Sequence, residues 1–454
     1  MKVIRILAVS VCFSLFTACA ANSAQVSSVA SSKKNSSVGI SSLMGSSQLS
    51  STPTSHQSSA VSSNISSAVS SKRTSSSKSS AASSKKTSSN KSSTLSSKNT
   101  SSQSVSSTLP DKSQFNAPAG YEKYSGTRNP FYWPFAATSI WNMPIGSGAV
   151  LKKAPFVAER VVKTDVEYVI QVQESDPVVE LYAPNSFKNR WPGKRLLGTM
   201  KVPYDFILPD VEGNHSPNNC ATFIQPDGRS LIQLEPCCRV EAGAQIVGHK
   251  CKFDIDIYGA GIQGTHYGSG LSAFGGSIRL GELTSDEPIK HALKLNVYAK
   301  KYLYYDENTD KGYIWPADRH DSYANKDDDN RAYGGTMPEL RMGTLLTIPK
   351  DITAESLGLK TEVAKKIFYA LQNYGCYIVD DSATDTYDWS VQSGVAEEVK
   401  AKYGFDLRAT SSQNNDYYKD SMKMFQNLYI VTNNSPTSIG GGGTPCKPLA
   451  PDFE

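Results

Sequence analysis

The stretch KFDIDIY, residues 252–258, alternates apolar and polar side chains with a period of two. This alternation predicts a β-strand, because successive side chains of a strand point to opposite faces of the sheet. The apolar residues would face a core, and Asp254 and Asp256 would project together from the other face. The same pattern recurs along the chain and decides the fold class.

Five further stretches show this alternation and are bounded by Gly, Asn, Asp or Pro. They are EYVIQVQ (167–173), SLIQLE (230–235), SIRLGEL (277–283), HALKLNVYA (291–299) and YLYYDENTDKGYIW (302–315), the last with a hairpin turn in its middle. We therefore predict a mainly β fold, an antiparallel β-sandwich of jelly-roll type with a few helices. The absence of a solenoid repeat in the sequence argues against a parallel β-helix.

One stretch predicts a helix instead. TEVAKKIFYALQNYG, residues 361–375, spaces its apolar residues helically and ends at Gly375, a residue typical of helix C-termini. The strand-like CYIVDD, residues 376–381, follows directly.

Residues 1–110 show signs of export and no pattern that could bury a core. Lys2 and Arg5 precede an apolar run that ends at small residues, which predicts a signal peptide over residues 1–18. FTAC, ending at Cys19, indicates lipidation of that cysteine, with plain cleavage and secretion as the alternative. Residues 19–110, rich in Ser, predict a disordered linker, and residues 111–454 a single β-rich catalytic domain. We expect an outer-membrane or cell-surface lipoprotein, or else a secreted protein, with membrane contact only through the lipid.

The formal net charge of +5 describes the linker rather than the folded domain. Twelve of the 47 Lys and Arg residues, but only one of the 42 acidic residues, lie in residues 1–112, so the remainder carries 35 basic and 41 acidic residues, a net charge of −6. Binding of nucleic acid is disfavoured, because it requires a basic surface. The expected partner is a polysaccharide substrate, and we expect a monomer.

Six cysteines follow the signal peptide: Cys220, Cys237, Cys238, Cys251, Cys376 and Cys446. An even number in an exported chain predicts disulfides, with pairs inside residues 220–251 and a bond between Cys376 and Cys446 favoured among fifteen possible pairings. A four-cysteine metal site is the alternative, but the spacing lacks two CxxC motifs. The sequence DENTDKG, residues 306–312, fits a hairpin turn better than a calcium loop. We therefore expect no metal and no cofactor.

The stretch GIQGTHYGSGLSAFGGSIRLGEL, residues 261–283, contains seven glycines in 23 positions. Glycine permits positive φ and close approach of the backbone, so the stretch is either a site loop around His266 or a set of tight strand crossings. A nucleotide-binding loop is disfavoured, because no βα unit follows.

Four residues are predicted to be catalytic: Asp254, Asp256, Glu282 and His266. Glu282 lies on the apolar face of its predicted strand. Partial burial there would raise its pKa and suit it to general acid catalysis. The alternatives are ordinary surface aspartates at 254 and 256, and a Glu282 that caps or pairs with an Arg or Lys residue at the rim of the sandwich.

Eight residues are predicted to bind substrate. If the three strands around residues 252–299 are neighbours, one polar face would hold Arg279, Lys294, Asn296 and Tyr298 beside the aspartates. The others lie in loops that are long, polar and aromatic: Tyr267, Trp315, His320 and Tyr323. An acidic, solvated loop is the alternative for the region after residue 312.

The order of signal peptide with Cys19, Ser- and Lys-rich linker and β domain resembles that of bacterial surface enzymes that degrade plant or algal polysaccharides. Such enzymes often carry their modules on polyserine linkers. The resemblance covers residues 1–110 and implies polysaccharide degradation, but it transfers no catalytic residue.

The leading hypothesis is a glycoside hydrolase that uses two of the three carboxylates, one as acid and one as nucleophile or base. A polysaccharide lyase is the alternative, with His266 or Tyr298 as base and acid, and Arg279, Lys294 and Asn296 neutralising a uronate. A non-catalytic glycan-binding module, with Tyr267, Trp315 and Tyr323 as a stacking platform, is the third.

Overall fold

The structure is a computed structural model and describes residues 128–186, 189–209, 218–326, 330–411 and 415–453. These residues belong to one compact unit. The predicted signal peptide, Cys19 and the Ser-rich linker lie outside the described residues. No helix within the described ranges is both long enough and apolar enough to cross a membrane.

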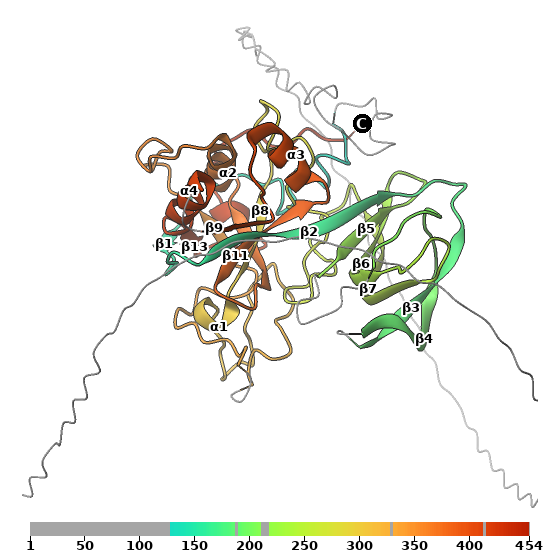
Figure 1. Cartoon of the computed structure of the whole chain (residues 1–454). Helices are drawn as coiled ribbons and strands as arrows, with labels where there is room; N and C mark the ends of the chain where they lie inside the picture. The colour runs from blue at the N-terminus through green and yellow to red at the C-terminus, as the bar shows by residue number, and fades with distance from the viewer. Residues whose placement is uncertain (1–127, 187–188, 210–217, 327–329, 412–414, 454) are drawn as a thin grey trace, which may run out of the picture. The chain divides into compact units, whose positions relative to one another are not determined.

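Thirteen strands of the described chain form one mixed sheet (Figure 1). They are β1 (Leu151–Lys153), β2 (Val161–Gln171), β3 (Val178–Ser186), β4 (Asn189–Lys201), β5 (Cys220–Ile224), β6 (Ser230–Cys238), β7 (Ile246–Asp256), β8 (Leu293–Val297), β9 (Leu345–Thr347), β10 (Cys376–Asp381), β11 (Thr386–Gln392), β12 (Ala409–Ser411) and β13 (Tyr429–Val431). Their order is β1-β13-β9-β10-β8-β11-β2-β5-β6-β7-β3-β4, with β12 paired to β2.

The prediction of a mainly β fold is confirmed, whereas the antiparallel sandwich is not. β2 pairs in parallel with both β5 and β11, and β8 pairs in parallel with β10. The parallel partners of β2 lie far along the chain, and β2 runs as a long strand through the middle of the molecule (Figure 1). The centre of the sheet is therefore built from strands that are distant in sequence.

Four α-helices lie in the described residues: α1 (Ala299–Tyr302), α2 (Glu362–Asn373), α3 (Val395–Tyr403) and α4 (Asp416–Phe425). A short 3₁₀ turn, η3, covers Ile439–Gly441. Helices α2, α3 and α4 lie together on the side of the molecule that carries β8 to β11 (Figure 1). Their apolar side chains join a large core cluster that includes Leu295, Ile367, Leu371, Trp389 and Phe425.

The helix predicted around residues 361–375 is confirmed as α2. The Thr361 hydroxyl accepts a hydrogen bond from the Ala364 amide at its N-terminus, as an N-cap residue does. Gly375 has a φ of 79°, and a Cβ there would lie 2.5 Å from the Leu346 carbonyl oxygen. Glycine is therefore needed to end α2 and to start the predicted strand, which is β10.

Two predicted strands are wrong. Residues 280–283 form turns, and residues 277–279 contain only an isolated parallel bridge between Ile278 and Val391. Glycines on both sides favour turns over a ladder there, and Gly276 and Gly281 have positive φ. In the stretch 302–315 the expected turn forms, since Asp306 and Lys311 make an isolated antiparallel bridge, but no continuous strands flank it.

The alternation in residues 252–258 is interrupted within β7. Asp254 has a φ of 55°, and the register between β6 and β7 shifts near this point, as at a β-bulge. Phe253 is consequently exposed, while Ile257 is buried. β7 has β6 and β3 as neighbours and β8 has β10 and β11, so the expected common polar face of these strands does not form.

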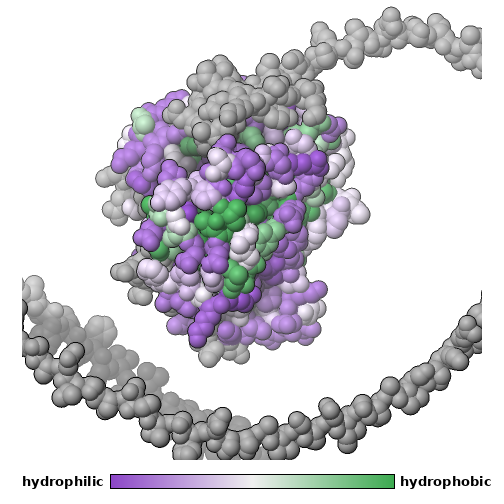
Figure 2. Space-filling model, turned by 90° about the vertical axis from the view of Figure 1, so that its right-hand side faces the viewer, coloured by the Kyte–Doolittle hydropathy of each residue, from purple (hydrophilic) through white to green (hydrophobic). Residues whose placement is uncertain are grey.

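Part of the surface formed by β3 to β7 consists of exposed apolar side chains. Figure 2 shows hydrophobic side chains gathered in the middle of this face, with hydrophilic side chains around them. Exposed large apolar residues of these strands include Val178 and Trp191, and β4 forms one edge of the sheet.

Candidate active site

Buried polar side chains gather on one face of the central strands. We call this group the His266 centre. It consists of Asp165, Glu167, Cys220, Glu235, His266, Lys294, Asn296, Asp321 and Asp380, all of them buried. Such a concentration of buried ionisable groups is costly unless the groups satisfy one another or serve a function.

Strand geometry explains why these side chains meet. Asp165 and Glu167 are two residues apart in β2, as are Lys294 and Asn296 in β8, so each pair faces one side of the sheet. Glu167 is directly opposite Cys220 in the parallel ladder between β2 and β5. The centre therefore depends on the register of strands that are far apart in sequence.

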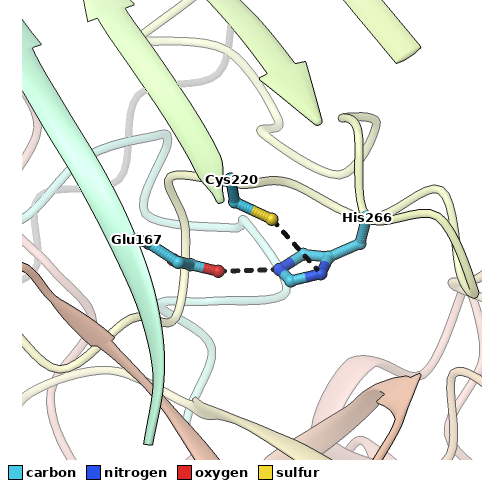
Figure 3. Close-up of side chains that lie close together, drawn as sticks. All are labelled: Glu167, Cys220 and His266. Carbon is cyan, nitrogen blue, oxygen red and sulfur yellow. Dashed lines mark hydrogen bonds and ion pairs between the residues drawn. The ribbon is translucent and has the colours of Figure 1, made fainter. Parts of the chain in front are cut away.

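His266 enters the centre from the glycine-rich loop. A Cβ on Gly264 would lie 2.4 Å from both the Gln233 side-chain oxygen and the Ser272 Cα, so only glycine permits this close approach of the loop to the sheet. The His266 Nε2 lies 2.8 Å from Glu167 Oε1. On the other side of the ring, Nδ1 lies 3.8 Å from Cys220 Sγ (Figure 3).

Glu167 is the most fully bonded carboxylate of the centre. Lys294 Nζ donates to both of its oxygens, at 2.6 and 2.8 Å, and the Ser277 hydroxyl also donates to it. Burial would raise the pKa of Glu167, but Lys294 and His266 outweigh burial and hold it below its usual value. Glu167 is therefore an ionised anchor that orients the imidazole of His266.

The imidazole has two further carboxyl neighbours on its Nδ1 side. Asp380 Oδ2 lies 3.7 Å from Nδ1 and Glu235 Oε2 lies 3.9 Å from it. Burial, the largest influence, raises the pKa of both carboxyl groups well above the usual value. Burial and Lys294 act to lower the pKa of His266, yet Asp380 and Glu167 raise it overall.

Asp380 lies between two other carboxyl groups. Asn218 Nδ2 donates to Asp380 Oδ2 at 3.2 Å and to Asp165 Oδ2 at 3.3 Å. On the other side, a Cβ on Gly268 would lie 2.8 Å from Asp380 Oδ1 and 3.2 Å from Asp321 Oδ2. Glycine at position 268 therefore lets the loop backbone approach these two carboxyl groups closely.

Asp165 and Asp321 have different surroundings. Asn296 donates to Asp165 at 3.0 Å, and burial raises the pKa of Asp165. The Tyr333 hydroxyl donates to Asp321 Oδ2 at 2.8 Å, and burial raises the pKa of Asp321 to about 7. Asn218, bonded to Asp165, is only partly buried, so the centre approaches the surface there.

An open cleft of about 490 Å³ lies beside the loop and is lined by residues 255, 256, 259–263 and 315–318. We call it the Trp315 cleft. Two chain segments connect it with the His266 centre, one running from residue 261 to His266 and the other from Trp315 to Asp321. The cleft offers the Trp315 ring and the Asp256 and Asp318 side chains to a ligand.

Five of the predicted site residues lie in these two places. His266, Lys294 and Asn296 belong to the His266 centre, and Asp256 and Trp315 line the cleft. The glycine-rich loop thus brings its histidine into a buried polar centre.

The three predicted catalytic carboxylates are not brought together. Asp256 makes a two-point ion pair with Arg229, and Asp254 is exposed. Glu282 lies 3.1 Å from His291 and accepts a hydrogen bond from the Arg279 backbone amide, rather than pairing with the side chain of an Arg or Lys. Each residue therefore has its own local partners.

The remaining predicted binding residues also have local contacts. Tyr267 lies against the ring of His249, Arg279 is buried and donates to the Phe274 carbonyl, and Tyr298 precedes α1. None of these contacts involves a side chain of the His266 centre.

His320 and Tyr323 lie near Asp321 in the chain. The ring of His320 is surrounded by three tyrosine rings, and the Tyr323 hydroxyl donates to Asp381 at 2.9 Å. Both side chains support the segment that carries Asp321 rather than facing the Trp315 cleft.

Sequence reasoning missed most carboxyl groups of the centre. Glu167, Glu235 and Asp380 all lie inside stretches that were correctly predicted as strands. The available signal was an acidic residue within a stretch predicted to be a buried strand, which is unfavourable unless the carboxyl group has a specific partner.

The predicted disulfides are not present in the structure, where all six cysteines are free thiols. Cys237 and Cys238 are consecutive residues of β6 and point to opposite faces, and Cys376 lies in the core. Burial raises the pKa of the Cys220 thiol well above its usual value, so this thiol is not an activated nucleophile.

Comparison with known proteins gave no match to a family model, to a curated protein or to a solved structure. The functional conclusion therefore rests on the site itself.

Proposed function

We propose that the chain is a glycan-cleaving enzyme of the hydrolytic type that acts at the His266 centre. The observation that carries the proposal is the position of Asp165 and Asp321 on the two sides of Asp380, together with a cleft that offers an aromatic ring on the chain segments leading to His266 and Asp321. Sugar rings stack on aromatic side chains, and Trp315 is the ring available in this cleft.

Asp165 and Asp321 supply the two carboxyl groups that the reaction requires. Hydrolysis of a glycosidic bond needs one carboxyl group to protonate the leaving oxygen and a second to act as nucleophile or to activate water. The Tyr333 hydroxyl donates a hydrogen bond to Oδ2 of Asp321. Asp165 is held by Asn218 and Asn296.

The charge of the centre supports a neutral glycan as the substrate. The His266 centre contains five carboxyl groups and two basic side chains, Lys294 and His266. Both basic side chains are already engaged by Glu167. A uronate carboxylate would therefore meet repulsion there, because the energy of like charges is large in a buried site.

A polysaccharide lyase is the second candidate, and one observation favours it. His266, Lys294 and Asn296, which were predicted to serve a lyase, do lie together. In that reaction His266 would remove the proton beside the uronate carboxylate while Lys294 and Asn296 stabilised the resulting charge.

The test uses the full chain with a panel of neutral and uronate-containing polysaccharides. Reducing ends and the ultraviolet absorbance of an unsaturated product are followed together. We expect reducing ends without the absorbance, and a loss of roughly 10²- to 10⁴-fold in rate for Asp165→Asn and for Asp321→Asn. Asp254→Asn, which changes an exposed carboxylate, is the control and should retain the wild-type rate.

Other outcomes would contradict the proposal. A rise in absorbance would favour the lyase. Retention of the chain on a polymer without cleavage would favour a glycan-binding module.

A further inference from the structure

Glu235, His266 and Asp380 present three potential metal ligands to one point of the His266 centre. The Nδ1 of His266 lies 3.7 Å from Asp380 Oδ2 and 3.9 Å from Glu235 Oε2, and the three ligand atoms all lie within 4.8 Å of one another. We propose that these three side chains bind one divalent transition-metal ion, with Zn²⁺ as the best fit. This inference goes beyond glycan cleavage and does not depend on it.

The separations are close to those of a bound ion. Ligands at the usual zinc distances of about 2.0–2.2 Å, in a tetrahedral arrangement, lie about 3.4 Å from one another. The two separations from Nδ1 are only slightly wider. The three ligand atoms would therefore move closer together when the ion binds.

Glu235 points independently to a missing positive partner. Its side chain is 1% exposed, and neither carboxylate oxygen has a hydrogen-bond partner among the residues that the structure describes. The Cys220 thiol and the Tyr267 amide approach it and act to lower its pKa, but without ordinary hydrogen-bond geometry. Buried carboxylates are normally paired or coordinate metals, so an ion is the partner that this carboxylate lacks.

The second nitrogen of His266 is arranged as in known metal sites. A histidine that binds a metal through one nitrogen usually donates the proton of the other nitrogen to a carboxylate. Here Nε2 lies 2.8 Å from Glu167, which is itself fixed by Lys294 and Ser277. Asp380 is held in the same way by Asn218. Two of the three ligands, His266 and Asp380, are thus oriented by outer contacts.

The ligand types select the kind of ion. Ca²⁺ and Mg²⁺ prefer oxygen ligands alone, whereas a site with one imidazole and two carboxylates suits Zn²⁺ or Mn²⁺. Zn²⁺ binds nitrogen and oxygen ligands more strongly than Mn²⁺ does, and the Cys220 sulfur 3.8 Å from Nδ1 also suits the softer ion. Three protein ligands leave a position for water or for a substrate oxygen.

The experiment measures metal binding directly. The full chain is stripped with a chelator, dialysed, and titrated with ZnCl₂ by calorimetry, and the zinc bound per chain is measured by elemental analysis. We expect one zinc ion per chain and a melting temperature that rises with zinc concentration. Glu235→Gln and Asp380→Asn should lose the high-affinity binding. Glu167→Gln, which removes the carboxylate beside the second nitrogen of His266 but no proposed ligand, should weaken it roughly 10- to 100-fold.

Glu282→Gln is the matched control, because Glu282 also lies beside a histidine, His291, but outside the His266 centre. It should bind zinc as the wild type does. Equal zinc binding by the wild type and by a folded Glu235→Gln or Asp380→Asn variant would overturn the site, as would a folded wild type that binds none. Circular dichroism identifies the folded variants, and the use of two ligand variants keeps the test decisive if one fails to fold. Zinc binding without any glycan cleavage would leave this site standing and refute only the proposed function.

Discussion

Replacement of Lys294 by methionine is expected to lower the free energy of unfolding by about 3–5 kcal/mol, the usual cost of removing one partner of a buried ion pair. Lys294 and Glu167 are both fully buried, and their charged atoms lie 2.6 Å apart. Lys294 also donates to the Ser272 carbonyl at 3.0 Å. Methionine keeps most of the apolar stem, so the loss reports the charge of Glu167 left without its cation.

Urea unfolding at neutral pH measures this loss, and a double-mutant cycle with Glu167→Gln assigns it. The double variant leaves no carboxylate without a partner, so we expect its cost to fall short of the sum of the single costs by about 1–3 kcal/mol. Lys152→Met is the matched control, because Lys152 pairs with Glu339 at 2.7 Å but is exposed, and its cost should stay below about 1 kcal/mol. Additive costs, or equal costs for Lys294→Met and Lys152→Met, would refute the reasoning.

Three further changes test other parts of the structure. Burial raises the pKa of Asp388 to about 7, so the folded state gains stability from this group at low pH and loses it as the pH rises from about 4 to 7. Asp388→Asn should therefore be more stable than the wild type at pH 8. We expect a gain of about 2 kcal/mol, which is less than the pKa shift alone would give because Asp388 is partly exposed. Urea unfolding at pH 4 and pH 8 measures this difference. Gly375→Ala should cost about 2 kcal/mol or more in urea unfolding, because it combines a positive φ with a Cβ 2.5 Å from the Leu346 carbonyl, and unchanged stability would contradict the strain. If the Trp315 cleft binds the substrate, Trp315→Ala should raise KM about tenfold with little change in kcat, and an unchanged KM would show that the glycan lies elsewhere.

Local features of the sequence determined those helices and strands that depend on interactions between residues close together in the chain. The helical spacing of Val363, Ile367 and Leu371 produces α2, and Gly375 ends it, because these effects act within one turn of backbone. Alternation likewise located β8, most of β6, the C-terminal part of β2 and the mainly β class, and the apolar run CYIVDD located β10. Alternation failed for residues 277–283, where glycines favour turns over a ladder.

Only the tertiary structure decided which of these faces meet. Glu167, Glu235 and Asp380 were all inside predicted strands, but nothing local shows that the strands of the first two are joined through β5, or that β10 reaches the same centre through β8 and β11. The glycines around His266 indicated a possible site loop in the sequence. Only the fold placed carboxyl groups on both sides of the His266 ring. Strand register is fixed by packing summed over the whole sheet, so a site assembled from several strands exists only once that sheet has formed.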